Sequence, residues 1–323
     1  MSKAQISLAA LLCCAAMGAQ ADANLYFSAS AENLVTQQFV YNSPPSVTSG
    51  PFTSAGTVSA NAGSVGASVT TWADPSLGMF KALARVDMTG NTEQINIANA
   101  VARFDLSDTL RFSGPGDKVQ VTWTLNYDTV FAGLGFTAFE RVNQISHFMQ
   151  ASSFRDLRLS YEVANPDYDP TATCTDLGSD GYYCPPETFA VITKEEYAGK
   201  TLFREVALGG PNGIYTNGDE DNGHYSGEIT LSLLLPTDVD VRLNYTAYNG
   251  VTCFHLANCS LSSDASHSDY LGLRVADGAS FSSAESYQYQ GLAAAVPEPA
   301  SALLSGLGLL AMAGWARRRP SKG

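Results

Sequence analysis

The chain has 323 residues, with 31 aspartates and glutamates against 18 lysines and arginines, so its formal net charge at pH 7 is −13. This acidity argues against nucleic acid and anionic membrane surfaces as partners, because both repel a negatively charged protein. The length leaves room for one large domain between targeting segments at the two ends.

Residues 1–23 have the pattern of a secretory signal peptide. Lys3 lies near the start, an apolar stretch runs from Ile6 to Met17, and small residues with two overlapping Ala-x-Ala cleavage patterns follow at 19–23. The apolar part is too short to span a bilayer permanently. We therefore expect export through the Sec translocon and cleavage by signal peptidase.

Residues 24–290 are predicted to form an all-β ectodomain. The segment 119–127 alternates strictly between an apolar and a polar face, as a half-buried strand does. Similar patterns recur at 157–163, 228–235 and 239–248. The best candidates for short helices are 140–148 and 193–198. Alternating strands separated by Gly, Pro, Asn and Asp predict an antiparallel β-sandwich that is jelly-roll-like.

Two short turns are expected between predicted strands. Residues 236–238, Pro-Thr-Asp, predict a hairpin connection between the strands at 228–235 and 239–248. The Ser-Gly-Pro-Gly-Asp segment at 113–117 separates two strands in a similar way.

Four of the six cysteines lie beyond the signal peptide, as two close pairs: Cys174 with Cys184, and Cys253 with Cys259. In an oxidising periplasm, local pairing is the simplest of three connectivities. Each disulfide would stabilise by about 2 to 3 kcal/mol, and we expect both to close loops rather than to hold the core. A zinc site that uses Cys253, His255 and Cys259 is the alternative, although the spacing matches no standard zinc motif.

The polar segment 217–228 has the ligand rhythm of a calcium loop. Oxygen-bearing side chains fall at its positions 1, 3, 5 and 12, as in an EF-hand. These residues are Asn217, Asp219, Asp221 and Glu228. Position 6 is asparagine rather than glycine, and strands flank the segment, so a solvated acidic hairpin loop is the alternative.

We expect no catalytic residues. The four histidines match no paired metal spacing, and the sequence contains no nucleophile elbow, phosphate loop or dinucleotide fingerprint. Paired carboxylates for glycoside hydrolysis are brought together by folding, so a polysaccharide-active hydrolase remains a weaker alternative. A sugar-binding module would use exposed aromatic faces, for which the candidates are Tyr182, Tyr183, Tyr287 and Tyr289.

The C-terminal end has three consecutive parts. A linker at 291–299 contains a proline-flanked glutamate, and the uncharged apolar segment 300–316 would form a transmembrane helix of about 25 Å. The basic tail 317–323 is expected to stay on the cytoplasmic side. The key residues are Pro297, Glu298 and Pro299 in the linker and Arg317, Arg318 and Arg319 in the tail.

These three parts resemble, in order and at the extreme end of an exported chain, the PEP-CTERM sorting signal of Gram-negative bacteria. The resemblance covers the last 28 residues, 296–323. It implies recognition by an exosortase, a membrane-embedded cysteine protease or transpeptidase that removes the tail near the motif. It also implies that the precursor is transiently anchored in the inner membrane with its C-terminus in the cytoplasm.

The expected function combines this signal with the acidic body. Removing the signal peptide deletes Lys3 and Asp22, which cancel, and removing the tail deletes one glutamate and four basic residues, so the formal charge goes from −13 to −16. We expect a structural protein of the cell surface or of an exopolysaccharide or biofilm matrix, with extracellular polysaccharide as a partner. A carbohydrate-binding β-sandwich module is the alternative.

Overall fold

The computed structural model describes residues 23–33, 37–43, 47–49, 54–89, 96–134, 147–208, 214–256, 258–267 and 269–289. The chain divides into two units, Met1–Gln290 and Gly291–Gly323, and all described residues belong to the first. Apart from Ala23, the predicted signal peptide lies outside the described residues, as do the linker, the transmembrane helix and the basic tail.

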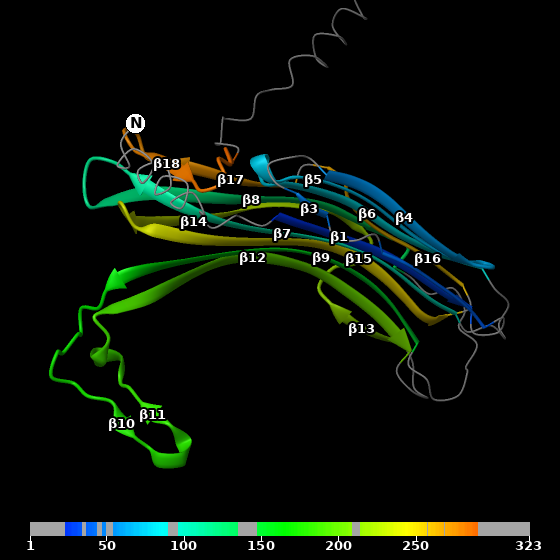
Figure 1. Ribbon diagram of the computed structural model, residues 1–323. Helices are drawn as coiled ribbons and strands as arrows, with labels where there is room; N and C mark the ends of the chain where they lie inside the picture. The colour runs from blue at the N-terminus through cyan, green and yellow to red at the C-terminus, as the bar shows by residue number, and fades with distance from the viewer. Residues whose placement is uncertain are drawn as a thin grey trace, which may run out of the picture. The chain divides into compact units, whose positions relative to one another are not determined.

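Two antiparallel sheets make up the described chain (Figure 1). Sheet 1 has the order β13-β12-β9-β15-β7-β1-β2, with β18 beside β7 and β3 beside β1. Its strands are β1 (Ala23–Asn33), β2 (Gln38–Asn42), β3 (Val47–Ser49), β7 (Asn96–Ser113), β9 (His147–Ala164), β12 (Val191–Leu208), β13 (Ile214–Gly218), β15 (Asp240–Leu256) and β18 (Ser280–Ser283).

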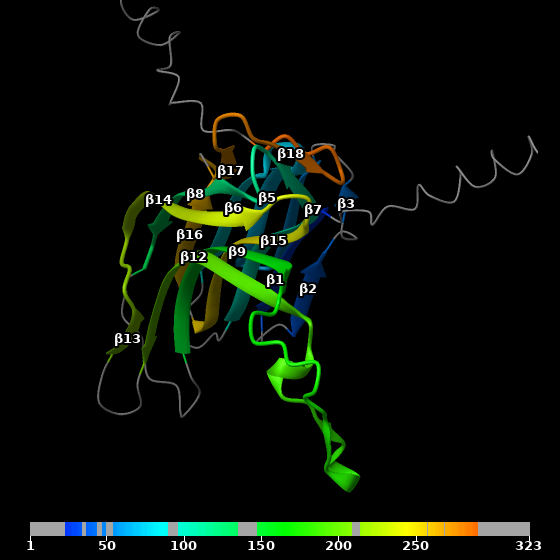
Figure 2. The same ribbon diagram turned by 90° about the vertical axis from the view of Figure 1, so that its left-hand side faces the viewer.

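Sheet 2 has the order β14-β8-β16-β6-β5-β4, and β17 pairs with β6 and β8. Its strands are β4 (Ser54–Ala62), β5 (Val65–Asp74), β6 (Met79–Met88), β8 (Lys118–Ala132), β14 (Gly223–Pro236), β16 (Cys259–Ala265) and β17 (Tyr270–Val275). The two sheets pack face to face, with β1 against β4 and β5, and β15 against β6 and β16 (Figure 2).

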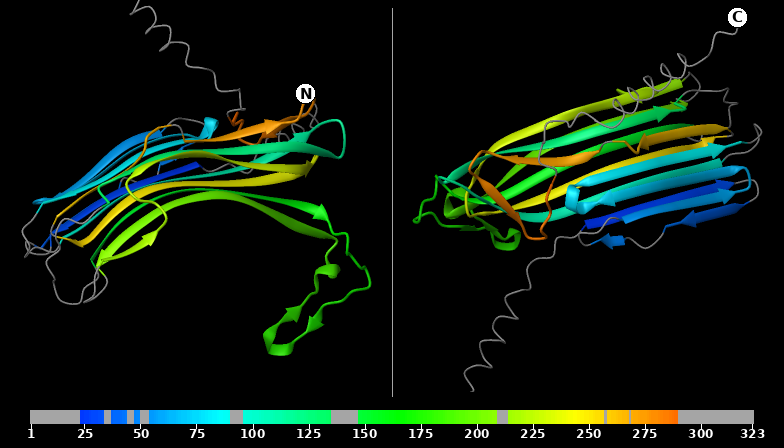
Figure 3. Two further views of the ribbon diagram at one scale, coloured as in Figure 1. Left: turned by 180° about the vertical axis from the view of Figure 1, so that it is seen from behind. Right: turned by 90° about the horizontal axis from the view of Figure 1, so that it is seen from above.

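A separate hairpin of β10 (Thr175–Asp176) and β11 (Tyr182–Tyr183) lies in the loop between β9 and β12. We call this loop, residues 165–190, the arm. Its root is held by backbone bonds, because the Asn165 amide donates to the Ala190 carbonyl and the Asp169 amide donates to the Glu187 carbonyl. Most of its side chains are exposed, and it extends beyond the ends of the two strands (Figures 1 and 3).

The strand periodicity follows the predicted alternation. In β8, Val121, Trp123 and Leu125 are fully buried, whereas Gln120 before them is exposed and Thr122 is half-buried. Thr124 departs from the pattern, because it is buried as well. In β9, Leu157 and Leu159 are buried at the predicted inward positions. Because apolar side chains of both sheets face each other, the core lies between the sheets, and the all-β antiparallel sandwich is confirmed.

The prediction of a hairpin at 236–238 is wrong. β14 belongs to sheet 2 and β15 to sheet 1, so this turn carries the chain from one sheet to the other. The turn at 114–117 crosses in the opposite direction, from β7 to β8, and the Thr237 amide donates to the Asp117 carbonyl between the two turns. Alternation shows which face of a strand is apolar but does not show which strand lies beside it, which is why the sequence pattern misled here.

The predicted helix at 193–198 is also wrong, because these residues lie in β12, where they pair with β9. Among the described residues, the helical segments are three 3-10 turns, η1 (Pro75–Leu77), η2 (Gly178–Asp180) and η3 (Pro186–Thr188). In the part of the chain that the structure covers, no helix has the length and apolar character needed to cross a bilayer. The other predicted helix, 140–148, lies almost wholly outside the described residues.

Candidate functional site

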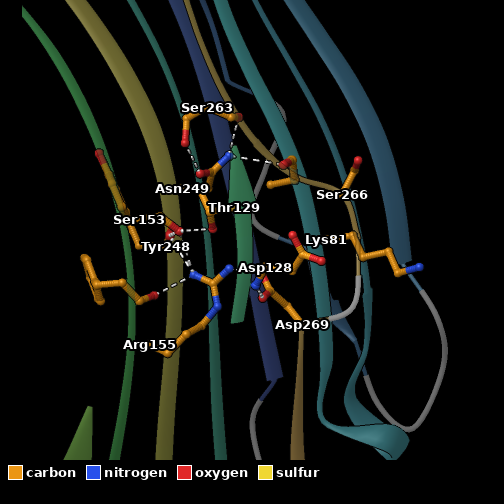
Figure 4. Close-up of polar contacts among 12 residues, drawn as sticks. Lys81, Asp128, Thr129, Ser153, Arg155, Tyr248, Asn249, Ser263, Ser266 and Asp269 are labelled. Atoms are coloured by element: carbon orange, nitrogen blue, oxygen red, sulfur yellow. Dashed lines mark hydrogen bonds and ion pairs between the residues drawn. The ribbon is translucent and has the colours of Figure 1, made fainter. Parts of the chain in front are cut away.

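An ion pair lies inside the sandwich. Arg155 faces inward from β9, and its guanidinium Nη2 contacts Asp269 Oδ2, with side-chain exposures of 1% and 0%. Arg155 Nη1 also donates to the carbonyl oxygens of Phe154 at 2.7 Å and Tyr248 at 2.9 Å. The backbone amide of Asp128 donates to Asp269 Oδ1 at 2.8 Å. Figure 4 shows these groups gathered between strands of both sheets.

A second polar contact joins the sheets nearby. Asn249 on β15 is fully buried, and its Nδ2 donates to the carbonyl oxygens of Ala82 at 3.1 Å and Ser263 at 2.7 Å. The hydroxyl of Ser263 donates back to Asn249 Oδ1. These bonds connect sheet 1 to β6 and β16 of sheet 2, so the polar groups satisfy one another across the core (Figure 4).

The buried network acts on the fold rather than on a substrate. Burial raises the pKa of the Asp269 carboxyl, and the charge and hydrogen bond of Arg155 oppose that rise. Burial also raises the pKa of the neighbouring Tyr245 phenol. Neither member of the ion pair is exposed enough to touch a soluble molecule. Its chemical role is therefore to fix how the two sheets face each other.

The two predicted cysteine pairings are confirmed, but their roles differ. Cys174–Cys184 closes the exposed arm, as expected for a loop disulfide. Cys253–Cys259 is buried and joins β15 of sheet 1 to β16 of sheet 2, so the expectation that neither pair holds the core is wrong for this one. The zinc alternative is also wrong, because both sulfurs are bonded to each other.

The predicted calcium ligands are not brought together. Asn217 is the next-to-last residue of β13, and Asp219 directly follows the end of this strand. Glu228 lies inside β14. Six residues lie between Asp221 and Glu228, and five of them belong to the extended strand β14. Asp221 Oδ1 lies 2.7 Å from Arg204 Nη2. The described residues contain no group of three His, Cys, Asp or Glu that could hold a metal ion. Calcium binding by this loop stays a prediction.

Two of the four predicted sugar platforms are buried, so that prediction is wrong for them. Tyr287 and Tyr289 are 3% and 2% exposed, because the chain after β18 folds back over the sandwich. Tyr289 Oη donates to Asp108 Oδ2 at 2.8 Å, and its ring packs edge-on against Trp123. Burial raises the pKa of Asp108. The other two candidates, in β11 on the arm, are exposed: Tyr182 and Tyr183.

Two adjoining depressions lie on the outer face of sheet 1, the face turned away from sheet 2. Their volumes are about 790 and 510 Å³, and they share Arg111, Asp240 and Arg242. Arg111 Nη2 lies 2.7 Å from Asp240 Oδ1. Within the described part of the chain, the Arg242 guanidinium has no hydrogen-bond or ion-pair partner. The depressions therefore present an unpaired hydrogen-bond donor to solvent.

The sequence analysis missed the residues of this face. Tyr197 lies in the predicted short helix 193–198. The inward residues of this region, Ala198, Leu202 and Val206, recur every four residues, a spacing that puts side chains on one face of either a helix or a strand. The local sequence pattern therefore does not distinguish a helix from a strand here. Only pairing of β12 with β9 along all 18 residues of the strand places Tyr197 on the outer face.

Residues 295–319 match the sequence family described as the PEP-CTERM protein-sorting motif. No curated protein and no solved structure matches the chain. The resemblance seen in the sequence is thereby confirmed for the C-terminal segment. The motif implies an exported protein that is transiently anchored in a membrane and processed by an exosortase.

Proposed function

We propose that this chain, which carries a PEP-CTERM sorting motif, is a structural protein of the cell surface or of an extracellular matrix such as a biofilm. The observation that carries the proposal is the sorting motif at 295–319 on a sandwich whose sheets are joined by the buried Cys253–Cys259 disulfide. Disulfides persist in oxidising compartments outside the cytoplasm. The motif and the disulfide therefore support the same destination.

The route to that destination uses both ends of the chain. Ala23 is buried as the first residue of β1, and it pairs with Leu106. We therefore place the signal-peptidase cut after Ala21, which leaves Ala23 in the mature sandwich. The basic tail 317–323 would stay in the cytoplasm while the transmembrane helix holds the precursor in the inner membrane. Exosortase cleavage near Glu298 then frees the body for the surface or the matrix.

The sandwich suits a passive role in a hydrated matrix. Three arginine-aspartate pairs lie on the outer face of sheet 1, and residues 24–295 carry a formal charge of −16. A charged surface keeps such a protein soluble. Successive strands β6, β7, β8 and β9 alternate between the two sheets, which supports the jelly-roll-like arrangement. The proposal assigns the protein no catalytic step.

A carbohydrate-binding module is the second candidate. The observation that favours it is the pair of depressions on the outer face of sheet 1, with the unpaired Arg242 in both. Open depressions lined by arginine, aspartate and hydroxyl side chains suit sugar units better than large apolar ligands. In a matrix protein, such a face would attach the sandwich to polysaccharide.

The test is the intact mass of the protein, without reductant, in the inner-membrane, outer-membrane and extracellular fractions of the host. We expect the outer-membrane or extracellular form to begin at residue 22, to end near Pro297 and to be four hydrogens lighter than the reduced chain. Extra mass at the new C-terminus would identify a covalently attached group. Recovery of a form that retains 317–323, confined to the inner membrane, would overturn the proposal.

A further inference from the structure

The outer face of sheet 1 is built as a grid of aligned side chains. Strand register places Tyr197 of β12 beside Arg158 of β9, Arg158 beside Asn244 of β15, and Asn244 beside Ser107 of β7. With strands about 4.8 Å apart, this row extends roughly 14 Å across the sheet. The ribbons of β9 and β12 curve so that this face is concave (Figures 1 and 3). A chain-like ligand could therefore lie across the strands.

Tyr197 forms an aromatic platform at one end of the row. Its side chain is 61% exposed. A Cβ atom added to Gly199 would overlap the Tyr197 hydroxyl, which shows that the end of the ring lies directly over this glycine. The ring therefore extends over the strand backbone at this glycine, and the guanidinium carbon of Arg158 lies 6.0 Å from the ring centroid. Most of the side chain is still open to solvent and available for stacking.

Polar groups occupy the other end of the row. Ser107 and Asn244 line the larger depression, and Ser107 Oγ donates to Asn244 Oδ1 at 2.8 Å. The next row contains the exposed Arg242, which lies between Thr109 and Ser160. Guanidinium and amide groups are planar and present several donors or acceptors side by side. Neighbouring hydroxyl groups of one sugar ring match that arrangement.

Charge decides which kind of glycan fits. Three ion pairs on this face, Arg103–Asp105, Arg158–Asp156 and Arg111–Asp240, cancel their own charges. Near the row, strand register places the acidic residues Glu162 and Glu195 on the same face as Arg242, although neither forms an ion pair with it. These residues together carry no excess of positive charge. The strongly acidic body would repel a polyanion. The complementary occupant is a sugar chain without charge.

We propose that the outer face of sheet 1 binds a segment of neutral polysaccharide, with one sugar ring stacked on Tyr197 and a neighbouring one hydrogen-bonded by Asn244 and Arg242. Stacking uses the apolar C–H face of the sugar, and the polar groups use its hydroxyls. The proposal rests on the proposed function only for the extracellular location of the protein. Its new content is the chemical class of the partner in the matrix. The site itself is argued from the geometry of the sheet.

The experiment is native gel electrophoresis of the full chain in mild detergent, through gels that contain a neutral polysaccharide. The probes are a soluble β-glucan, a galactomannan and dextran, with alginate as the polyanionic comparison. We expect retardation by at least one neutral polymer and none by alginate. Tyr197→Ala and Arg242→Ala should each weaken binding about tenfold, a typical loss for a central tyrosine or arginine contact.

Two matched variants serve as controls. Arg274→Ala removes an exposed arginine from β17 of sheet 2, opposite Thr122, and Tyr168→Ala removes an exposed tyrosine from the arm. Both should bind like the unmodified chain. All four substituted side chains are exposed, so thermal unfolding should show that every variant folds.

Three outcomes of the gel experiment are incompatible with the proposed glycan site. Absence of retardation by all three neutral polymers, retardation by alginate alone, or equal losses in the controls and in the Tyr197 and Arg242 variants would overturn the inference. None of these results depends on where the protein is delivered. Correct processing and delivery together with failed glycan binding would leave the structural role standing and remove only the glycan site.

Discussion

Arg155 and Asp269 form an ion pair between the two sheets, and their side chains are almost completely withdrawn from solvent. The carboxylate also accepts a bond from the Asp128 amide, and the guanidinium donates to backbone carbonyls of β9 and β15. The pair therefore forms only when several strands of both sheets lie in their correct relative positions. A buried pair of this kind specifies an arrangement more than it adds stability.

We predict that Arg155→Met lowers the free energy of unfolding by about 3 to 5 kcal/mol, because it leaves the Asp269 charge buried without a partner. The double variant Arg155→Met/Asp269→Leu should recover much of that loss, since no buried charge remains. Denaturant unfolding of the purified protein measures both. The control is Arg103→Met, which breaks the exposed pair with Asp105 and should cost less than about 1 kcal/mol. An equally small loss for Arg155→Met would contradict the prediction.

The two disulfides should differ in their effect on global stability. Replacing Cys253 and Cys259 with alanine should lower the free energy of unfolding by about 2 kcal/mol or more, because the bond links the two sheets inside the core. Replacing Cys174 and Cys184 should change it by less, because that bond lies in the exposed arm. Its loss should appear instead as faster proteolysis within 165–190. Identical shifts in melting temperature for the two double variants would argue against this division.

Asp108 should make stability depend on pH. Burial raises its pKa in the folded state, so the native protein keeps this proton to a higher pH than the unfolded chain does. The stability that the retained proton gives the folded state is therefore fully present below the usual aspartate pKa, near 3.9. It is lost as the pH rises through the raised pKa of the folded state. Asp108→Asn does not titrate and keeps an oxygen that can accept the bond from Tyr289.

The measurement is the melting temperature of the original protein and of Asp108→Asn at a series of pH values from 4 to about 8. We expect the melting temperature of the variant to increase relative to that of the original protein as the pH rises. Glu285 also faces Asp108 and raises the pKa of its carboxyl further, so Glu285→Gln should move the transition to lower pH. A difference that shrinks with rising pH would show that the sign is wrong.

Glu298 should decide the fate of the tail. Glu298→Gln alters the residue between Pro297 and Pro299 in the matched motif, and we expect the full-length precursor to accumulate in the inner membrane. Immunoblots of membrane and extracellular fractions follow the two forms. Glu187→Gln, a change to an exposed glutamate in η3, is the control and should mature normally. Normal maturation of the Glu298 variant would count against handling by an exosortase.

Local patterns predicted much of the fold. Strict alternation in 119–127 identified the buried face of β8, and close spacing identified both cysteine pairs, because both depend on residues near one another in the chain. The error at 193–198 has the same origin, since six residues by themselves do not show that the segment pairs with a strand elsewhere in the chain. Pairing with β9 overrode the local preference there.

The sequence by itself determined the sorting motif and the strand-rich, acidic character of the body, because charge, apolar length and alternation are properties of short segments. Only the tertiary structure decided that Cys253–Cys259 joins two sheets, that Arg155 is buried against Asp269, and that Tyr289 is a core residue rather than a sugar platform. The physical reason is separation along the chain. Tyr289 meets Asp108 across 181 residues, and no local pattern records a contact that depends on the order in which strands assemble.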